Sequence, residues 1–312
     1  MKTLILTGTL VAAMVLPAEV SRGSMTVLSE NFNGATISAG TTGAGGTAYI
    51  QGATNWYSTQ PALAGSPSGL ATDNTAPLSG NVANFSGGSG NGNLVGAFTP
   101  VTLTAGGTNS ITLTLDYRAT TLPTTYGPLI GLYNDGGTAV AGNQFYSGVA
   151  PAVLQDDKGY NVEKTLNAST SDIIMHSETA SATSGKNTFY NFGNQAVLAT
   201  TSSGINANNT TSVYSMGLTL TLQSNGDLLV ASSFGGVTNS TTVLAVNVLT
   251  TTFNEVAITP SAQYSGGVWH VDNILVTSGT PEPSTTAMFG LGLLGLVALQ
   301  RYRSRSRNSS CA

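Results

Sequence analysis

Alternation of apolar and polar residues is the clearest pattern in this sequence. Residues 110–117 place isoleucine, leucine and tyrosine at every second position, with threonine and aspartate between them. A period of two is typical of a β-strand that buries one of its faces. Residues 218–222 and 228–232 repeat the pattern on either side of Asn225-Gly226, a dipeptide that supplies the positive φ angles of a tight turn. These two segments therefore predict a β-hairpin.

Shorter apolar segments, each bounded by Gly, Asn, Ser or Thr, predict further strands. They cover residues 27–32, 48–51, 82–86, 129–133, 172–176, 243–249, 253–258 and 268–276. Residues 40–46, 87–92 and 200–211 are rich in glycine or polar residues and are expected to form loops. Because no segment between the two ends has the apolar stripe of a helix that could connect parallel strands, we expect an all-β fold, an antiparallel β-sandwich of the jelly-roll type.

The N-terminal residues have the pattern of an export signal. Lys2 precedes an apolar run over residues 4–16, and small residues follow at Ala18 and at Gly23-Ser24. This order is that of a secretory signal peptide, with cleavage after Ala18 or near Ser24. We therefore expect residues 1–24 to form a signal helix that is removed, and residues 25–279 to form the β-sandwich domain.

The C-terminal residues combine three features in a fixed order. A Pro-Glu-Pro motif is followed by an apolar span over residues 284–300 and then by four arginines. As a helix, the span is about 25 Å long at about 1.5 Å per residue, near the short limit for crossing a bilayer. The arginines predict its cytoplasmic end, so the body faces outward. The motif and the arginine cluster consist of Pro281, Glu282, Pro283, Arg301, Arg303, Arg305 and Arg307.

This order of features resembles the PEP-CTERM sorting signal of Gram-negative bacteria. The resemblance covers residues 280–307 and implies recognition by an exosortase, a processing enzyme thought to cut near Pro-Glu-Pro. It also implies an inner-membrane intermediate that later reaches the cell surface or the extracellular medium. We therefore expect residues 280–312 to be a sorting segment with a transmembrane helix and an Arg-rich tail. A membrane anchor that is never cut is the alternative.

The two ends of the body resemble the concanavalin A-like lectin and LamG-type jelly rolls. The body opens on Glu30-Asn31-Phe32 and closes on the apolar strand over residues 268–276, as if its first and last strands were neighbours. This resemblance implies a jelly roll, and it makes a carbohydrate-binding module the main alternative to a structural or adhesive protein.

Charge and cysteine content exclude several classes of protein. Residues 25–280 contain twelve acidic and four basic side chains, a net charge of −8. A body of this charge is repelled by nucleic acid and by anionic lipid, so no nucleic-acid partner is expected. Cys311 is the single cysteine, so no intramolecular disulfide can form.

No arrangement of residues predicts catalysis. Glycosidases with a similar jelly roll carry Glu-x-Asp-x-x-Glu on one strand, and this pattern is absent. No two acids of the body are two or four positions apart, so no strand presents two carboxylates on one face. Gly290-x-Gly292-x-x-Gly295 matches a dinucleotide fingerprint only formally, since no βαβ unit can follow it. We therefore expect no enzyme, no catalytic residues and no cofactor-binding residues.

Histidines and Asp-rich turns are the candidates for metal ligands. His176 and Glu178 could share a strand face, but a solvated histidine near a strand end is the simpler interpretation, and His270 is interpreted as structural. Four turns are oxygen-rich, as calcium sites are, but their spacing matches no EF-hand, so turn formation is the default role and no metal is predicted. These turns are Asp73-Asn74, Asp135-Gly136, Asp156-Asp157 and Asn225-Gly226-Asp227.

Aromatic residues leave two interpretations open. Trp56-Tyr57, Tyr126 and Tyr133 either form a platform for sugar rings or fill the core of the sandwich. The sequence as a whole favours an exported protein of the cell surface or extracellular matrix with a structural or adhesive role. Extracellular polysaccharide is the expected partner, a carbohydrate-binding module is the alternative, and a glycan-cleaving enzyme is the third.

Overall fold

The computed structural model describes the β-sandwich body in twelve segments. They are residues 23–37, 50–58, 69–86, 94–105, 108–121, 126–140, 154, 156–165, 171–179, 195–205, 209–260 and 267–280. Residues 24–280 form one compact unit. Residues 1–22 of the predicted signal segment, the Pro-Glu-Pro motif, the apolar span and the arginine cluster lie outside the described residues, whereas Gly23 and Ser24 belong to a β-strand of the body. Within the described ranges, no helix has the length and apolar character needed to cross a membrane.

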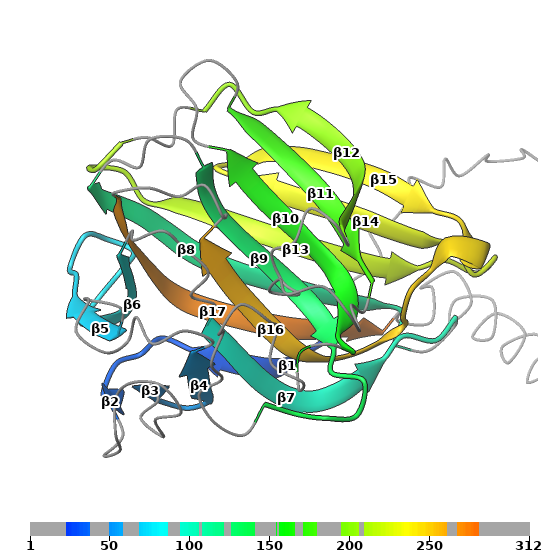
Figure 1. The fold of residues 1–312 in the computed structure, drawn as a ribbon, viewed down its shortest axis with the longest axis horizontal. Coiled ribbons are helices and arrows are strands. Elements are labelled where there is room, and N and C mark those ends of the chain that lie inside the picture. The colour runs from blue at the N-terminus through cyan, green and yellow to red at the C-terminus, as the bar shows by residue number, and fades with distance from the viewer. Residues whose placement is uncertain are drawn as a thin grey trace, which may run out of the picture. The chain divides into compact units, whose positions relative to one another are not determined.

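Two antiparallel sheets make up the body (Figure 1). The strands of sheet A are β1 (Gly23–Glu30), β5 (Gly69–Thr72), β6 (Asn81–Ser86), β8 (Ser110–Thr121), β13 (Tyr214–Leu222), β14 (Leu228–Phe234), β15 (Val237–Val243) and β17 (Val268–Thr280). The strands of sheet B are β2 (Thr36–Ile37), β3 (Ile50–Gln51), β4 (Asn55–Ser58), β7 (Leu94–Thr102), β9 (Tyr126–Asn134), β10 (Lys158–Thr165), β11 (Asp172–Glu178), β12 (Gln195–Ser202) and β16 (Thr252–Pro260). Their spatial order is β15-β14-β13-β8-β17-β6-β5 in sheet A and β12-β11-β10-β9-β16-β7-β4-β3-β2 in sheet B.

The chain passes back and forth between the two sheets. Strands β6, β7, β8 and β9 alternate between sheet A and sheet B, and so do β15, β16 and β17. This alternation gives the jelly-roll sandwich that the sequence predicts. Strand β1 pairs with β17, so the first and last strands of the body are neighbours, as expected from its two ends.

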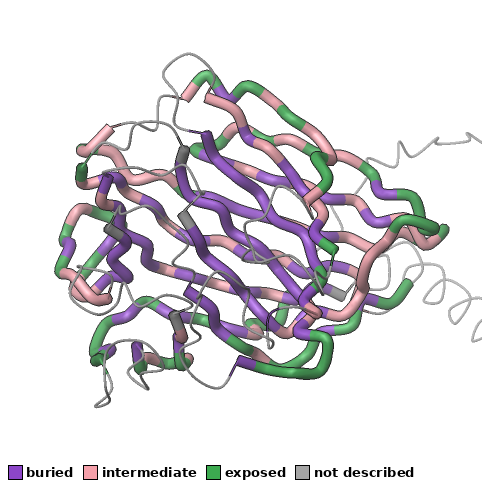
Figure 2. The backbone as a smooth tube through the Cα atoms, viewed as in Figure 1, coloured by how far each residue is buried: buried purple, intermediate pink, exposed green. Residues whose placement is uncertain are grey.

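The core lies between the sheets and follows the predicted alternation. Along β8, the side chains of Ile111, Leu113, Leu115 and Tyr117 are buried, while the threonines between them are partly exposed. Figure 2 shows that buried positions gather in the middle of the body and that exposed positions lie toward its margins. Trp269 on β17 stacks on Phe85 of β6 with 4.0 Å between ring centroids, which closes the core beside β8.

The predicted hairpin is confirmed, but its turn differs in detail. Strands β13 and β14 pair from Met216–Phe234 to Leu222–Leu228. Only Gly226 of the Asn-Gly pair has a positive φ, of 87°. Its N–H donates to the carbonyl of Gln223 (3.0 Å), and the N–H of Gln223 donates to the carbonyl of Asp227 (2.8 Å). One glycine in the left-handed region therefore closes a longer loop than the predicted tight turn.

The predicted strand over residues 243–249 is wrong. Val243 ends β15, and the chain then forms the 3-10 helix η4 (Ala245–Asn247). The N–H of Ala245 donates to Oδ1 of Asp227 (2.8 Å), which holds η4 against the β13–β14 turn. Strands β2, β4, β5, β7, β10, β12 and β15 were not predicted, and β12 occupies residues 200–202 of a predicted loop.

Candidate functional site

Four acidic side chains gather at one end of sheet B, on the face turned away from the core. Asp135 follows β9, Asp156 and Asp157 precede β10, and β9 and β10 are paired neighbours. Glu255 on β16 is paired with Tyr133, two residues before Asp135. Val256 and Ile258 belong to the core between the sheets, so Glu255 points to the opposite face. We call Asp135, Asp156, Asp157 and Glu255 the acidic cluster.

A turn at the end of β9 positions two members of the acidic cluster. The N–H of Thr138 donates to the carbonyl of Asp135 (3.0 Å), and Oδ1 of Asp135 accepts the N–H of Gly137 (2.9 Å). Gly136 has a φ of 61°, and the carboxyl group of Asp156 lies where its β-carbon would be. Glycine at position 136 thus permits both the turn and the approach of Asp156.

The other two members are enclosed without hydrogen-bond partners. Asp157 and Glu255 are each 0% exposed, and neither of their two carboxyl oxygens has a hydrogen-bond partner. Burial raises the pKa of Asp157 to about 8, and the charges of Asp156 and Asp135 add to the effect. Burial also raises the pKa of Glu255 well above its ordinary value, with a further contribution from Asp157. The protein thus holds buried carboxyls whose charge is not compensated by hydrogen bonds.

A second polar group lies next to the acidic cluster on the same face. Oε2 of Glu178 accepts hydrogen bonds from the hydroxyl of Tyr133 (3.2 Å), from Nδ2 of Asn161 (3.3 Å) and from Nε2 of Gln195 (3.4 Å). Burial raises the pKa of Glu178, although these bonds oppose the shift. This carboxyl therefore has the polar contacts that Asp157 and Glu255 lack.

His176 is buried, so the interpretation as a solvated histidine is wrong. Its side chain is 3% exposed, and its Nε2 lies 3.5 Å from Oε2 of Glu163 on β10. The reason is β12, which pairs with β11 and places His176 inside the sheet instead of at its edge. Among the described residues, no group of three or more His, Cys, Asp or Glu side chains is arranged to hold a metal ion as it stands.

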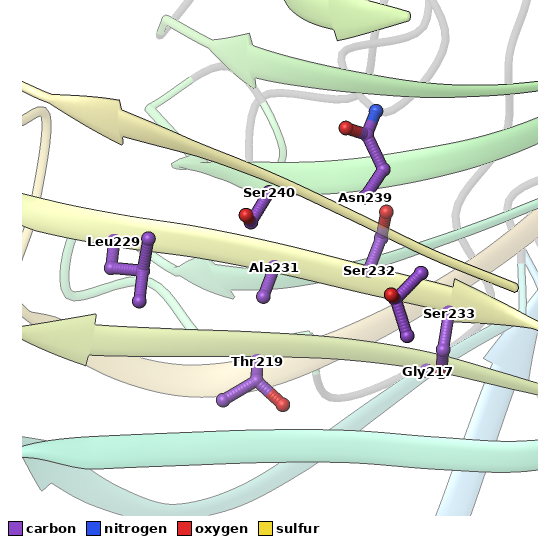
Figure 3. Close-up of a pocket in the computed structure, with 9 residues that line it drawn as sticks. Gly217, Thr219, Leu229, Ala231, Ser232, Ser233, Asn239 and Ser240 are labelled. Atoms are coloured by element: carbon purple, nitrogen blue, oxygen red, sulfur yellow. The ribbon is translucent and has the colours of Figure 1, made fainter. Parts of the chain in front are cut away.

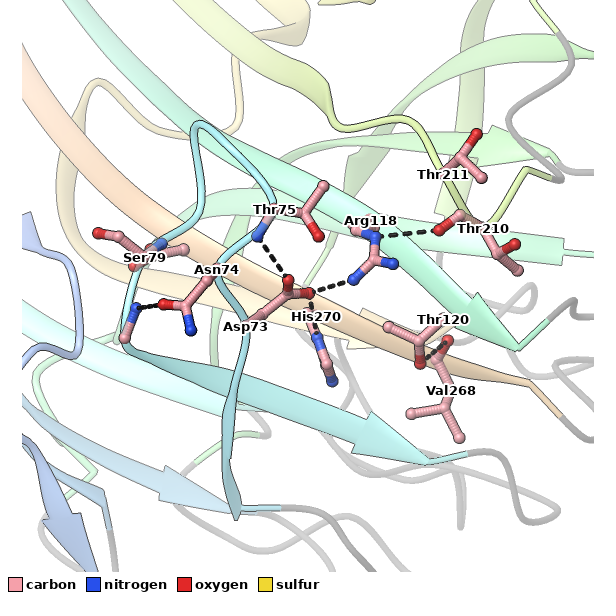
Figure 4. A network of polar contacts seen from close by, with 12 residues as sticks. Asp73, Asn74, Thr75, Ser79, Arg118, Thr120, Thr210, Thr211, Val268 and His270 are labelled. Carbon is pink, nitrogen blue, oxygen red and sulfur yellow. Dashed lines mark hydrogen bonds and ion pairs between the residues drawn. The ribbon is translucent and has the colours of Figure 1, made fainter.

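His270 takes part in a polar network on sheet A (Figure 4). Oδ2 of Asp73 lies 2.7 Å from Nδ1 of His270 and 2.6 Å from the guanidinium of Arg118, and Oδ1 accepts the N–H of Thr75 (2.9 Å). Burial alone would raise the pKa of Asp73, but these hydrogen bonds outweigh burial and hold the pKa well below its usual range. The network fastens the β5–β6 turn to β8 and β17.

The four oxygen-rich turns divide into two kinds. Asn74 accepts the N–H of Gly80 (3.0 Å), and Asp227 accepts from Asn225 (2.7 Å) and Ala245, so these two turns use their oxygens for local hydrogen bonds. The turns at Asp135 and at Asp156-Asp157 instead meet in the acidic cluster. Sequence reasoning missed Glu255 as their neighbour, and the available signal was an acid in the middle of the predicted strand over residues 253–258.

The candidate aromatic platform divides between core and surface. Trp56 and Tyr133 are 0% exposed, and Trp56 packs 5.9 Å from Phe32 in the core. Tyr57 is partly exposed, and the side chain of Tyr126 lies outside the described residues. Core filling is therefore the correct interpretation for Trp56, and Tyr133 serves the polar group around Glu178.

The outer face of sheet A carries an open pocket of about 690 Å³ (Figure 3). Strand register places Thr219, Ala231 and Ser240 in one row across β13, β14 and β15. Four of the nine lining residues present a hydroxyl on this face, whereas Ser232 is 4% exposed and its hydroxyl is buried, and none of the nine is charged. The nine are Gly217, Thr219, Leu229, Ala231, Ser232, Ser233, Thr238, Asn239 and Ser240. We call this surface the hydroxyl face.

Three solved structures that align with this chain share little sequence with it. Lectin II from Ulex europaeus has 12% identity and a TM-score of 0.39, covering 72% of this chain and 91% of its own. The CBM2 module of the evolved Dit protein of Lactobacillus casei BL23 phage J-1 has 12% identity and a TM-score of 0.40, covering 85% and 100%. A carbohydrate esterase of the Shiga toxin-encoding bacteriophage phi24B has 12% identity and a TM-score of 0.40, covering 82% and 99%. Comparison with curated proteins finds no match.

Comparison with protein-family models identifies the C-terminal segment. Residues 280–303 match the PEP-CTERM protein-sorting motif. The match includes Pro281, Glu282, Pro283, Arg301 and Arg303, and two further arginines follow it in the sequence. The predicted sorting signal, with Pro-Glu-Pro, an apolar span and arginines in that order, is thus confirmed as this motif. The chain carries a PEP-CTERM protein-sorting motif, which indicates exosortase-dependent export to the cell surface.

Proposed function

We propose that the body has a structural or adhesive role at the cell surface and that its hydroxyl face contacts uncharged extracellular polysaccharide. The observation that carries this proposal is the composition of the pocket on sheet A, where hydroxyl groups stand beside small apolar side chains and none of the lining residues is charged. Hydroxyl groups exchange hydrogen bonds with sugar hydroxyls, and methyl-bearing side chains cover the apolar edges of a sugar ring.

Two further features support contact through hydroxyl groups with a neutral polymer. Burial of Trp56 and Tyr133 removes two of the candidate aromatics from a stacking platform. The body's net charge of −8 disfavours approach of an acidic polysaccharide. The enclosed position of Asp157 and Glu255 also favours a non-catalytic role, because a glycan-cleaving pair must reach its substrate.

A co-sedimentation experiment tests the proposal. The processed protein from the cell surface or medium is mixed with an insoluble neutral glucan and, separately, with an acidic polysaccharide gel. We expect retention on the neutral glucan only, and about a tenfold loss of affinity in Ser240→Lys and Thr219→Lys, because a lysine ammonium must be desolvated in the pocket.

Val197→Lys is the matched control. Val197 on β12 is 63% exposed and belongs to the other sheet, so a lysine there should leave binding unchanged. Equal retention of wild type and both pocket variants would show that the hydroxyl face is not the contact surface.

A further inference from the structure

We propose that the acidic cluster binds a divalent cation, with calcium preferred over magnesium. The proposed ligands are carboxylate oxygens from Asp135, Asp156, Asp157 and Glu255. They come from the turn after β9, the segment before β10 and the outer face of β16. The site lies on sheet B, away from the hydroxyl face of sheet A, so the proposal is independent of the proposed function.

The first argument is the enclosure of oxygens that have no partner. Asp157 and Glu255 are completely buried, and all four of their carboxyl oxygens lack a hydrogen-bond partner in the structure. Oδ1 of Asp156 is also buried and without a partner. Buried polar atoms are almost always hydrogen-bonded, paired or bound to a metal, so five such oxygens in one cluster indicate a missing partner.

The second argument is the absence of a compensating base in the described part of the chain. The ion pairs there join Arg118 and His270 to Asp73, and His176 to Glu163, and none involves the acidic cluster. Lys158 is next to Asp157 in the sequence but is exposed, and Lys164 lies over the ring of Phe234 on sheet A. Up to four negative charges therefore face one another without a cationic side chain.

A proton satisfies this arrangement less well than a metal ion. Protonation removes the charge of a carboxyl group but adds only one O–H donor. The other oxygen of that carboxyl group therefore still has no hydrogen-bond partner. A cation contacts several carboxyl groups at once and compensates their mutual repulsion. The donors are all oxygen atoms, which hard cations such as calcium and magnesium prefer over soft metals.

The present arrangement is not a closed metal cage, and this feature favours calcium. Asp156 is held against Gly136, and Asp135 is held by the N–H of Gly137. The carboxyl groups of Asp157 and Glu255 have no such bonds, so no hydrogen bond has to break when their oxygens bind an ion. Calcium accepts six to eight oxygen ligands in variable geometry, whereas magnesium demands a near-ideal octahedron. A loosely arranged set of carboxylates completed by water therefore suits calcium.

Calcium titration of the chelator-treated full chain tests the proposal. We expect calcium to bind by isothermal titration calorimetry, to raise the melting temperature in the range of about 0.1–10 mM, and to exceed magnesium in both effects. Asp157→Asn and Glu255→Gln should each lower calcium affinity by about tenfold or more, since each removes a charged ligand. Both variants should be at least as stable as wild type without calcium, because they also remove a buried charge.

Asp227→Asn serves as the control, because this acid lies in an oxygen-rich turn whose oxygens already accept local hydrogen bonds. It should keep the full calcium response. Absence of any calcium-dependent shift in the wild type would overturn the proposal, and so would an equal shift in both cluster variants. If Glu255→Gln does not fold, Asp157→Asn and the wild-type titration still decide the question.

Discussion

The carboxylate of Glu30 accepts the indole N–H of Trp56, with 3.4 Å between Oε2 and Nε1, and so joins the two sheets. Glu30 ends β1 in sheet A, whereas Trp56 lies on β4 in sheet B. The same carboxylate accepts the backbone N–H of Phe32 (2.8 Å) and of Thr54 (3.0 Å). Phe32 adopts a φ of 53°, which is uncommon for a residue with a side chain, and the bond to Glu30 holds it there.

Glu30→Gln should destabilise the body through this junction. Glutamine has one acceptor oxygen, so at least one of the three N–H groups loses its partner and faces an amide NH₂ group. We expect a loss of about 2–3 kcal/mol in the free energy of unfolding, because an unsatisfied buried donor costs about 1–3 kcal/mol and the lost bonds are charge-assisted. Urea denaturation measures it. The control is Asn31→Ala, which removes only an exposed bond to the N–H of Asn33 and should cost less than about 1 kcal/mol.

Lys164→Met should stabilise the protein. Lys164 is 0% exposed, its Nζ donates to the carbonyl of Thr165 (2.8 Å), and it lies 5.4 Å from the centre of the Phe234 ring. Burial lowers the pKa of Lys164 to about 8, with a smaller opposing effect from Asp172. Methionine fills the same space without a charge, so we expect a gain of about 1–3 kcal/mol at pH 6.

The gain from Lys164→Met should depend on pH in a defined direction. Because the folded pKa is below the unfolded one, the penalty for lysine is full below about pH 8 and disappears as the pH rises toward 10.5. Lys158→Met, at an exposed position, should have little effect at any pH. A loss of stability in Lys164→Met at pH 6 would show that the Thr165 bond and the Phe234 contact outweigh desolvation.

Asp272→Asn tests a pH dependence of stability that runs in the opposite direction to that of Lys164→Met, because the buried group is an acid. Asp272 is 0% exposed, and its Oδ2 accepts the N–H of Ser79 (3.3 Å). Burial raises the pKa of Asp272 to about 6, although backbone hydrogen bonds from Asn273 and Ser79 oppose the shift. The folded state therefore binds a proton more tightly than the unfolded state, and the contribution of Asp272 to stability falls as the pH rises from about 4 to about 6.

Equilibrium unfolding of wild type and Asp272→Asn at pH 4 and pH 8 measures this difference. The two proteins should be similar at pH 4, and the variant should be about 1–2 kcal/mol more stable at pH 8. Comparing the two proteins at each pH cancels the titration of other groups. Ser79→Ala keeps the backbone N–H and should follow the wild-type pH dependence. An equal difference at both pH values would contradict the assignment to Asp272.

Replacement of Pro281, Glu282 and Pro283 by alanine should block processing while the chain still reaches the membrane. The residues lie in the matched sorting motif, and the arginines that we expect to set topology are unchanged. Intact-mass analysis of membrane and medium fractions should find the uncut chain in the membrane only. Normal processing of this variant would show that the motif is a spacer and not a recognition signal.

Replacement of Arg301, Arg303, Arg305 and Arg307 by glutamine should have a different effect. Positive residues beside a span hold its end in the cytoplasm, so their loss should let uncut chains pass into the periplasm or the medium. The two sets of variants therefore separate recognition of the motif from retention of the tail. If both sets accumulate uncut in the membrane, the arginines act in recognition and not in topology.

Periodicity predicted β8 but missed β10 and β12, for different physical reasons. Residues 110–117 alternate strictly because β8 lies inside sheet A with one face on the core. Strand β10 is buried over almost its whole length, so its polar residues, such as Asn161 and Glu163, broke the expected pattern. Strand β12 is at the edge of sheet B and buries little, so its sequence carries no alternation of apolar residues.

The acidic cluster shows why the candidate site needed the tertiary structure. Two of its turns were recognised from their residue types, but nothing local relates Asp135 to Glu255. Pairing of β9 with both β10 and β16 sets their distance, and the register of each pair decides which side chains share a face. A one-residue shift of β16 against β9 would turn Glu255 into the core, and a one-residue shift of β10 against β9 would move Asp156 and Asp157 away from Asp135.

The sequence by itself determined the sorting motif, the all-β class and the main hairpin, because each depends on residues that are continuous in the chain. The sorting motif is read from a linear segment, and strand alternation reflects the backbone geometry of a few consecutive residues. The tertiary structure alone decided that His176 is buried, that Asp157 and Glu255 meet without partners, and that hydroxyl groups form a face on sheet A. These features depend on strand order and register, which arise from packing between distant segments and not from local propensity.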